Sequence, residues 1–228
     1  MKDIITLAKE RAELFGVKNV VIASIGDGAN LVCDAFGTED HLIIAVGNTS
    51  SARARGRTDD DADELNEIQL AKKRLEERGA KVLLQDQSLF QAMAHGSKSF
   101  GICDKRHSFG GYFGAVSLNE VIEKAGKEDA YGAVPIIYKT LNGLFGDGPR
   151  MCVEIALMAA DSGLLPLDAD CIAIDRPMPE SNCPHVAVVL RPAKTNDFFK
   201  YGLRVKDLIL VPGPRDHWFD NGPLWSEE

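Results

Sequence analysis

The sequence lacks any apolar run long enough to cross a bilayer, which takes about 20 consecutive apolar residues. The first residues, Met-Lys-Asp-Ile-Ile-Thr-Leu-Ala-Lys-Glu-Arg, predict an amphipathic helix, and we do not expect them to be a signal peptide. We therefore expect a soluble protein of the cytoplasm with no membrane partner. Basic residues are in deficit as well: 26 Lys and Arg stand against 34 Asp and Glu, for a net charge of −8. Sequence-independent binding to nucleic acid needs a basic surface, so no nucleic-acid partner is expected.

Cysteine is scarce and scattered. The five cysteines form no Cys-x-x-Cys pair and no Cys/His cluster at zinc-ligand spacing, so neither a disulfide framework nor a metal site is expected. Cys152 and Cys171 lie in apolar runs and are predicted to be small, buried core residues. This usage agrees with a reducing cytoplasm.

Familiar catalytic motifs are absent too. The chain has no Gly-x-Ser-x-Gly elbow, no His-Glu-x-x-His and no Walker lysine, and its five histidines are scattered singly. No set of nucleophile, base and orienting group is predicted. The sequence therefore assigns no catalytic residue and does not decide whether the chain is an enzyme.

The composition is that of an ordinary globular domain. With 228 residues, 45% hydrophobic and 26% charged, we expect a single α/β domain over residues 1–228. Residues 96–116 are rich in glycine and aromatics and lack periodicity, which predicts a long inserted loop. Its Lys105, Arg106 and His107 are candidate contacts for an anion, and a surface loop or a subunit contact is the equal alternative. Residues 212–228 predict an irregular C-terminal tail.

Helices and strands alternate along the first part of the chain. The predicted helices cover residues 4–15, 26–37, 62–78, 88–95, 117–125, 130–145 and 149–161, and the predicted strands cover residues 19–24, 41–46, 81–84, 170–175, 185–191 and 205–211. Strands that alternate with helices form right-handed crossovers in a parallel sheet. Little helix separates the last three strands, which allows an antiparallel end. The expected fold is a three-layer α/β/α sandwich with a mostly parallel mixed sheet.

Residues 52–61 are a basic run followed by an acidic one, which predicts a solvated loop. In the alternative, the arginines of this segment close over an anionic ligand.

One segment, residues 143–166, predicts a helix that is buried on all sides. Pro149 suits the first helical position, and Gly163 suits the position just past the end. The residues between are apolar on nearly every face, Glu154 excepted.

Two carboxylates of this helix have two possible roles. Glu154 and Asp161 are seven residues apart and lie on one side of the helix. The preferred interpretation is structural: Glu154 pairs with Arg150, four residues before it, and Asp161 caps a loop. In the alternative, both carboxylates face a ligand cleft.

Three motifs resemble a known family. They are Met-Cys-Val-Glu-Ile-Ala-Leu-Met-Ala-Ala-Asp-Ser-Gly-Leu-Leu-Pro (151–166), Val-Leu-Arg-Pro-Ala-Lys-Thr-Asn-Asp-Phe-Phe (189–199) and, more weakly, Val-Val-Ile-Ala-Ser-Ile-Gly-Asp-Gly (20–28). They resemble stand-alone, uncharacterised proteins related to the C-terminal α/β domain of pyruvate kinase, over about residues 5–215. The resemblance implies a three-layer sandwich with strand order near 3-2-1-4-5. It does not imply catalysis, because the active site of pyruvate kinase lies in a barrel domain. The C-terminal domain supplies a sugar-phosphate regulatory site in some members.

Ligands of such sheets bind beyond the carboxyl ends of the strands where strand order reverses, here between the first and fourth strands. The candidate residues follow the first, second and fourth strands: Ser24, Gly26, Asp27, Gly28, Ala29, Asn30, Gly47, Asn48, Thr49, Ser50 and Arg176. A glycine turn at a helix start offers free N–H groups to an anion, and an arginine can grip a phosphate as a planar fork. Because Leu31 occupies the third glycine position of the dinucleotide motif, we expect a mononucleotide or simple phosphate. The alternative is an ordinary turn capped by Asp27.

Arg191 lies inside a strand and is expected to pair with Glu154 or Asp161. Three hypotheses on function follow from the sequence. In the first, the chain binds a phosphorylated small molecule, FMN or a sugar phosphate, and forms a homo-oligomer. In the second, it is an enzyme of unassigned chemistry that uses Asp27, Asp175 or the 96–116 loop over the same cleft. In the third, it is a regulatory or structural subunit without a ligand.

Overall fold

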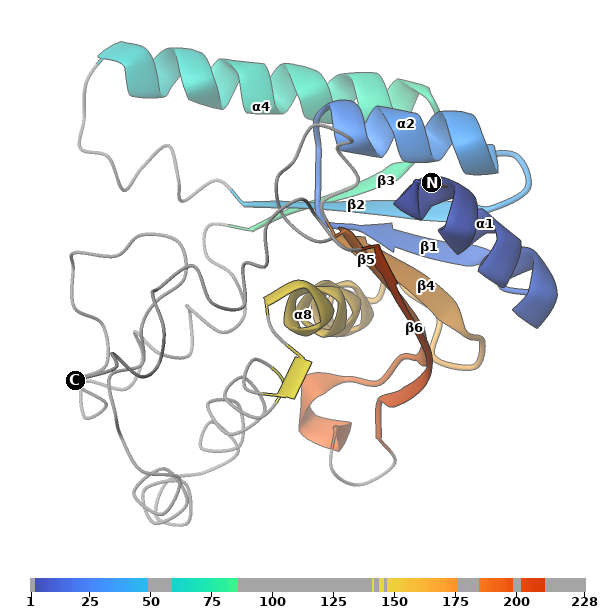
Figure 1. Ribbon diagram of the computed structural model, residues 1–228. Coiled ribbons are helices and arrows are strands. Elements are labelled where there is room, and N and C mark those ends of the chain that lie inside the picture. Colours follow the sequence, from blue (N-terminus) through green and yellow to red (C-terminus); the bar gives the residue numbers. More distant parts are fainter. Residues whose placement is uncertain are drawn as a thin grey trace, which may run out of the picture.

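The structure is a computed structural model that describes residues 3–48, 59–85, 141, 144–145, 147–175, 185–198 and 202–211 (Figure 1). In chain order the elements are α1 (Ile4–Phe15), β1 (Asn19–Ile22), α2 (Asp27–Phe36), β2 (Leu42–Asn48), α4 (Asp59–Glu77), β3 (Lys81–Gln85), α8 (Asp147–Asp161), β4 (Cys171–Asp175), β5 (His185–Arg191), the 3-10 helix η2 (Thr195–Asp197) and β6 (Arg204–Val211). Among the described residues, none of the helices combines the length and the apolar character needed to cross a bilayer.

The described strands form one mixed sheet in the order β3-β2-β1-β4-β5-β6. The first four of these run parallel, and β5 and β6 are antiparallel to their neighbours. The predicted fold class is confirmed, including the antiparallel end, and β6 extends the expected order by one strand.

Both faces of the sheet are covered, as the continuous apolar strands predict. Alternate residues of β1 point to opposite faces. Val20 and Ile22 pack in the core formed with α1 and α2, whereas Val21 packs in the core formed with α8. Figure 1 shows α1, α2 and α4 on one side of the sheet and α8 on the other. These are the three layers of an α/β/α sandwich.

The α8 helix is as buried as its sequence predicts. Residues 152–160 are all buried, and the small Ala156, Ala159 and Ala160 are fully inaccessible. Just after the helix, Gly163 has a φ of 74°, the left-handed conformation that favours glycine. Small residues let the helix lie close to the sheet, and they account for its contacts with β1, β4 and β5.

Some predicted boundaries are wrong by a few residues. β1 ends at Ile22 and not at residue 24, and β2 continues to Asn48. α4 begins at Asp59 and not at residue 62, so the end of the predicted 52–61 loop is helical. Acidic residues in a first turn are favourable because they complement the helix dipole. The predictions for residues 88–140 and 212–228 lie outside the described residues.

Candidate functional site

The strand order places the switch point where it was predicted, between β1 and β4. β1 pairs with β2 on one side and with β4 on the other. The connection through α2 runs over one face of the sheet, and α8, which leads into β4, covers the opposite face. The two helices thus start on opposite faces at the carboxyl edge of the parallel strands.

The turn after β1 leaves the start of α2 without a side-chain cap. Gly26 is the N-cap residue; its N–H lies 3.2 Å from Ser24 Oγ, and its carbonyl accepts from the N–H groups of Ala29 and Asn30. Within the described part of the chain, the N–H groups of Asp27 and Gly28 donate to no protein acceptor. The cap that the alternative assigned to Asp27 is therefore wrong, because Gly26 is the N-cap residue.

The described part of the chain leaves space beside this turn. Among the described residues, apart from the two chain neighbours of Gly26, no atom lies within 4 Å of the position that a Cβ on Gly26 would take. Gly26 and Asp27 are exposed, whereas Gly28 is buried. Two free N–H groups at the positive end of a helix dipole are suited to a small anion.

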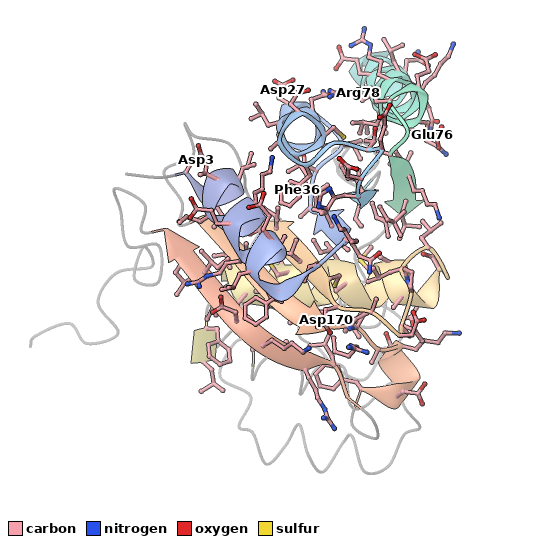
Figure 2. All side chains as sticks on the ribbon, turned by 90° about the vertical axis from the view of Figure 1, so that its right-hand side faces the viewer. Asp3, Asp27, Phe36, Glu76, Arg78 and Asp170 are labelled. Carbon is pink, nitrogen blue, oxygen red and sulfur yellow. The ribbon has the colours of Figure 1, made fainter. Side chains whose placement is uncertain are left out.

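Two of the candidate residues serve the fold itself. Ala29 is fully buried in the core. The Oδ1 of Asn30 accepts from Arg78 Nη1 at 2.8 Å, and its Nδ2 lies 3.4 Å from the Gly26 carbonyl. Arg78 follows α4, also bonds Asp34, and lies between α4 and α2 (Figure 2). No local sequence pattern signals this contact, because it joins residues 48 positions apart.

Gly47, which lies inside β2 and not in a turn after it, packs against Ile25 of the first turn. A Cβ on Gly47 would lie 2.6 Å from Ile25 Cγ2 and 3.0 Å from Leu84 Cδ2. Glycine at this position therefore allows close packing of apolar side chains. Asn48 is the last residue of β2. The other candidates, Thr49, Ser50 and Arg176, lie outside the described residues.

The start of α8 differs from that of α2 because a carboxylate lies next to it. Asp175, at the end of β4, is 4% exposed. A Cβ on Gly148 would lie 3.7 Å from its Oδ2 and only 2.5 Å from Val186 Cγ2. Burial, followed by the negative charge of Asp175, raises the pKa of the Cys152 thiol well above its usual range. The start of α8 thus lies next to the carboxylate of Asp175 and is tightly packed against Val186.

The carboxylates of α8 are structural, as preferred from the sequence. Arg150 Nη1 lies 2.6 Å from Glu154 Oε2, and the two residues are 6% and 0% exposed. Asp161 accepts from the N–H of Thr195 at 3.0 Å and from its hydroxyl at 2.6 Å. This pair of bonds fixes the start of η2 to the end of α8.

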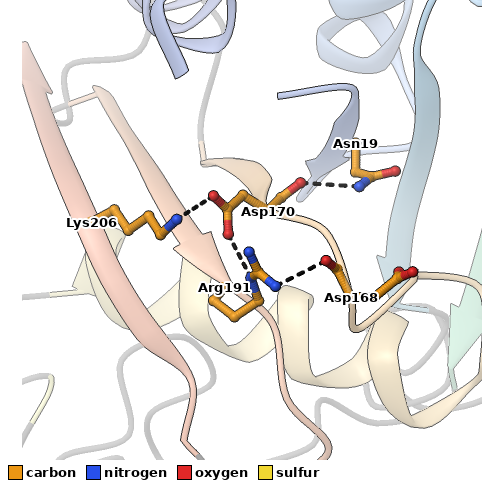
Figure 3. Close-up of polar contacts among 5 residues, drawn as sticks. All are labelled: Asn19, Asp168, Asp170, Arg191 and Lys206. Carbon is orange, nitrogen blue, oxygen red and sulfur yellow. Dashed lines mark hydrogen bonds and ion pairs between the residues drawn. The ribbon is translucent and has the colours of Figure 1, made fainter. Parts of the chain in front are cut away.

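The predicted partner of Arg191 is wrong. Its Nε donates to Asp170 Oδ1 at 2.6 Å, and its Nη1 donates to the Asp168 carbonyl at 2.9 Å (Figure 3). Lys206 bonds the other oxygen of Asp170, and Asn19 Nδ2 donates to the Asp170 carbonyl at 3.0 Å. Arg191 ends an antiparallel strand, so it lies at the amino edge of the parallel strands, away from the candidate site.

No model of a known protein family matches the chain. Among the described residues, no group of three or more His, Cys, Asp or Glu side chains could hold a metal ion. The resemblance to relatives of the pyruvate kinase C-terminal domain stays a prediction.

Proposed function

We propose that this protein binds a phosphorylated small molecule at the carboxyl edge of its sheet. The phosphate would accept from the N–H groups of Asp27 and Gly28. The observation that carries the proposal is the start of α2 at the switch point of the sheet, which has no side-chain cap and which no described residue covers beside Gly26. Helix starts of this kind bind phosphate through backbone N–H groups and the helix dipole together.

The start of α2 is a better anion site than the start of α8. The carboxylate of Asp175 lies beside the first turn of α8 and already complements its dipole. A phosphate there would be repelled by that charge and would meet Val186. At α2 the nearest acid is Asp27, whose side chain is exposed and therefore screened by water and salt.

The ligand class follows from the turn and from the family resemblance. A turn with Leu31 in place of a third glycine suits one phosphate group better than a pyrophosphate. FMN and sugar monophosphates each carry a single phosphate. Among these, FMN is the most concrete candidate. It is also easy to test for, because bound FMN would colour the purified protein. Two alternatives to ligand binding are an enzyme that uses the same cleft and a regulatory or structural subunit without a ligand.

The first experiment is to identify what the protein carries. Small molecules released from purified, denatured protein are analysed by mass spectrometry and by flavin absorbance. Binding of FMN, a sugar phosphate and inorganic phosphate is then measured by calorimetry. A phosphorylated compound in the extract or a measurable affinity supports the proposal. A clean extract together with no heat of binding for any phosphate contradicts it.

The matched variant is Gly26→Asp. Aspartate is a preferred N-cap residue, and its carboxylate would take the same N–H groups as the phosphate. We expect at least a tenfold loss of phosphate affinity while thermal stability stays equal or rises. Gln69→Glu on α4 makes the same charge change on a distant exposed surface and should leave binding unaltered. Equal affinity in Gly26→Asp and wild type would place the phosphate elsewhere. Turnover that is lost in Asp27→Ala would favour the enzyme alternative.

A further inference from the structure

The outer face of α4 carries features that neither the fold nor the proposed ligand uses. α4 covers β3, the last described strand at its end of the sheet, and of its residues 66–77 only Leu75 is fully buried. Figures 1 and 2 show the helix at the outer rim of the helical layer. Leu70 is 47% exposed, and helix periodicity puts it on a different side of α4 from the buried Leu75, five residues later.

Two unpaired charges flank this leucine. Glu67 and Arg74 are seven residues apart, which puts them on the same side of the helix and about 10 Å apart along its axis. They are too distant to pair with each other. Both are exposed, and within the described residues neither has an ion-pair partner.

The neighbouring charges of α4 do have partners. Lys72 pairs with Glu76 at 3.7 Å, and Lys73 pairs with Glu77 at 3.8 Å, each within one turn of the helix. Glu67, Leu70 and Arg74 therefore remain without a described partner on one surface of α4. This surface is complementary to that of a second α4 that runs antiparallel to it, because each acid then faces a base.

We propose that α4 docks against α4 of a second copy in an antiparallel pair. The two-fold axis passes between residues 70 and 71. Glu67 then meets Arg74 of the partner subunit, and Arg74 meets Glu67 of the partner subunit. Leu70 packs against Leu70 of the partner subunit. The contact between Glu67 and Arg74 then occurs twice, because a two-fold interface repeats every contact.

The predicted dimer is reversible. A single helix pair buries less than the roughly 800 Å² per partner that is typical of stable complexes. Exposed ion pairs contribute little each and are screened by salt. Dimerisation should therefore depend on protein concentration and weaken as the salt concentration rises. This inference does not depend on the proposed ligand.

The decisive experiment is a charge swap in the full-length protein, followed by sedimentation equilibrium at low salt. Glu67→Arg and Arg74→Glu each turn two attractions into two repulsions, and each should weaken dimerisation on the order of tenfold. The double variant Glu67→Arg/Arg74→Glu should recover wild-type dimerisation. Glu76→Arg makes the same charge change on another side of α4 and should have no effect. A wild-type protein that is monomeric throughout, or a double variant that does not recover, overturns the proposal.

A cross-link tests the geometry independently of the charges. In a background with Cys103→Ser and Cys183→Ser, Leu70→Cys places two thiols next to each other across the two-fold axis. The remaining cysteines are buried. Mild oxidation should give a covalent dimer for Leu70→Cys and none for Glu13→Cys, an exposed position on α1. Equal cross-linking of the two variants, or none for Leu70→Cys, contradicts the docking.

Discussion

At the scale of single residues, Asp27 is the side chain with opposing effects on stability and on the proposed ligand. Its charge favours the start of α2 by about 0.3–1 kcal/mol, but it also repels a phosphate bound there. We expect Asp27→Asn to bind inorganic phosphate about two- to fivefold more tightly at low salt and to lose a few tenths of a kcal/mol of stability. Calorimetry and urea unfolding measure the two effects. Asp40→Asn, which changes an exposed residue at the other edge of the sheet, should alter neither the phosphate affinity nor the stability. Weaker phosphate binding by Asp27→Asn would contradict the proposed site.

Gly148 tests which of two effects dominates at one position. Alanine has the higher helix propensity, by about 1 kcal/mol, so propensity alone predicts that Gly148→Ala stabilises α8. The new Cβ, however, would lie 2.5 Å from Val186 Cγ2 on the neighbouring strand. Overpacking of this kind typically costs about 1–3 kcal/mol, so we expect net destabilisation in urea unfolding. In the Val186→Ala background the same change should cost much less, and an equal cost in both backgrounds would refute the clash.

The glycines also show where inference from the sequence ends at this scale. A glycine after a strand predicts a turn, and both Gly26 and Gly47 are found near the carboxyl edge. The sequence does not say whether the missing side chain leaves room for a ligand or for a neighbouring residue. No described residue beyond its chain neighbours approaches the Cβ position of Gly26, whereas Gly47 accommodates Ile25 and Leu84. That distinction depends on side chains brought together by the fold, which have no local pattern.

At the scale of elements, the Arg150–Glu154 pair is the main polar feature inside α8. Removing one partner of a buried ion pair leaves an uncompensated charge and typically costs about 3–5 kcal/mol. We therefore expect Glu154→Leu to destabilise the protein by about that amount in urea unfolding. Arg150→Met/Glu154→Leu should cost less than Glu154→Leu, because the charge of Arg150 is then not left without that of Glu154. A double variant that is less stable than the single one would mean that the pair itself stabilises the fold.

Elements with strong local signals were predictable, and contacts between elements were less so. α8 was foreseen because its start, its stop and its apolar body agree, and β5 was predicted with its observed bounds. The partner of Arg191 was missed because the direction of β5 decides which edge of the sheet its last residue reaches. A strand's own sequence does not encode its direction in the sheet. Glu154 paired locally, four residues away, and was predicted correctly.

At the scale of the whole molecule, the two edges of the sheet differ in polar organisation. At the amino edge, the side chain of Asp170 joins three strands: it precedes β4 and bonds Arg191 of β5 and Lys206 of β6. At the carboxyl edge, the first N–H groups of α2 have no acceptor among the described residues. The charges described at the amino edge thus pair with one another within the protein. The backbone N–H donors of α2 at the carboxyl edge are the groups proposed to bind a ligand.

This contrast predicts how the stability of the protein changes with pH. Burial raises the pKa of Asp170, but hydrogen bonds from Lys206 and Arg191 outweigh it, so the pKa lies below its ordinary value. A carboxyl with a depressed folded-state pKa stabilises the protein above its unfolded pKa, about 3.9, and loses that effect as the pH falls through the folded pKa. Asp170→Asn should therefore cost about 1–2 kcal/mol of unfolding free energy at pH 7.

The same variant should differ less and less from wild type as the pH falls below about 4, because protonated aspartic acid resembles asparagine. Urea unfolding at pH 7, 5 and 3 measures the difference. Asp168→Asn is the matched control: Asp168 lies two residues away and offers Arg191 only its backbone carbonyl, so its loss of charge should cost little. A cost for Asp170→Asn that is constant over this pH range would mean that packing, and not the charge of the carboxylate, joins the three strands.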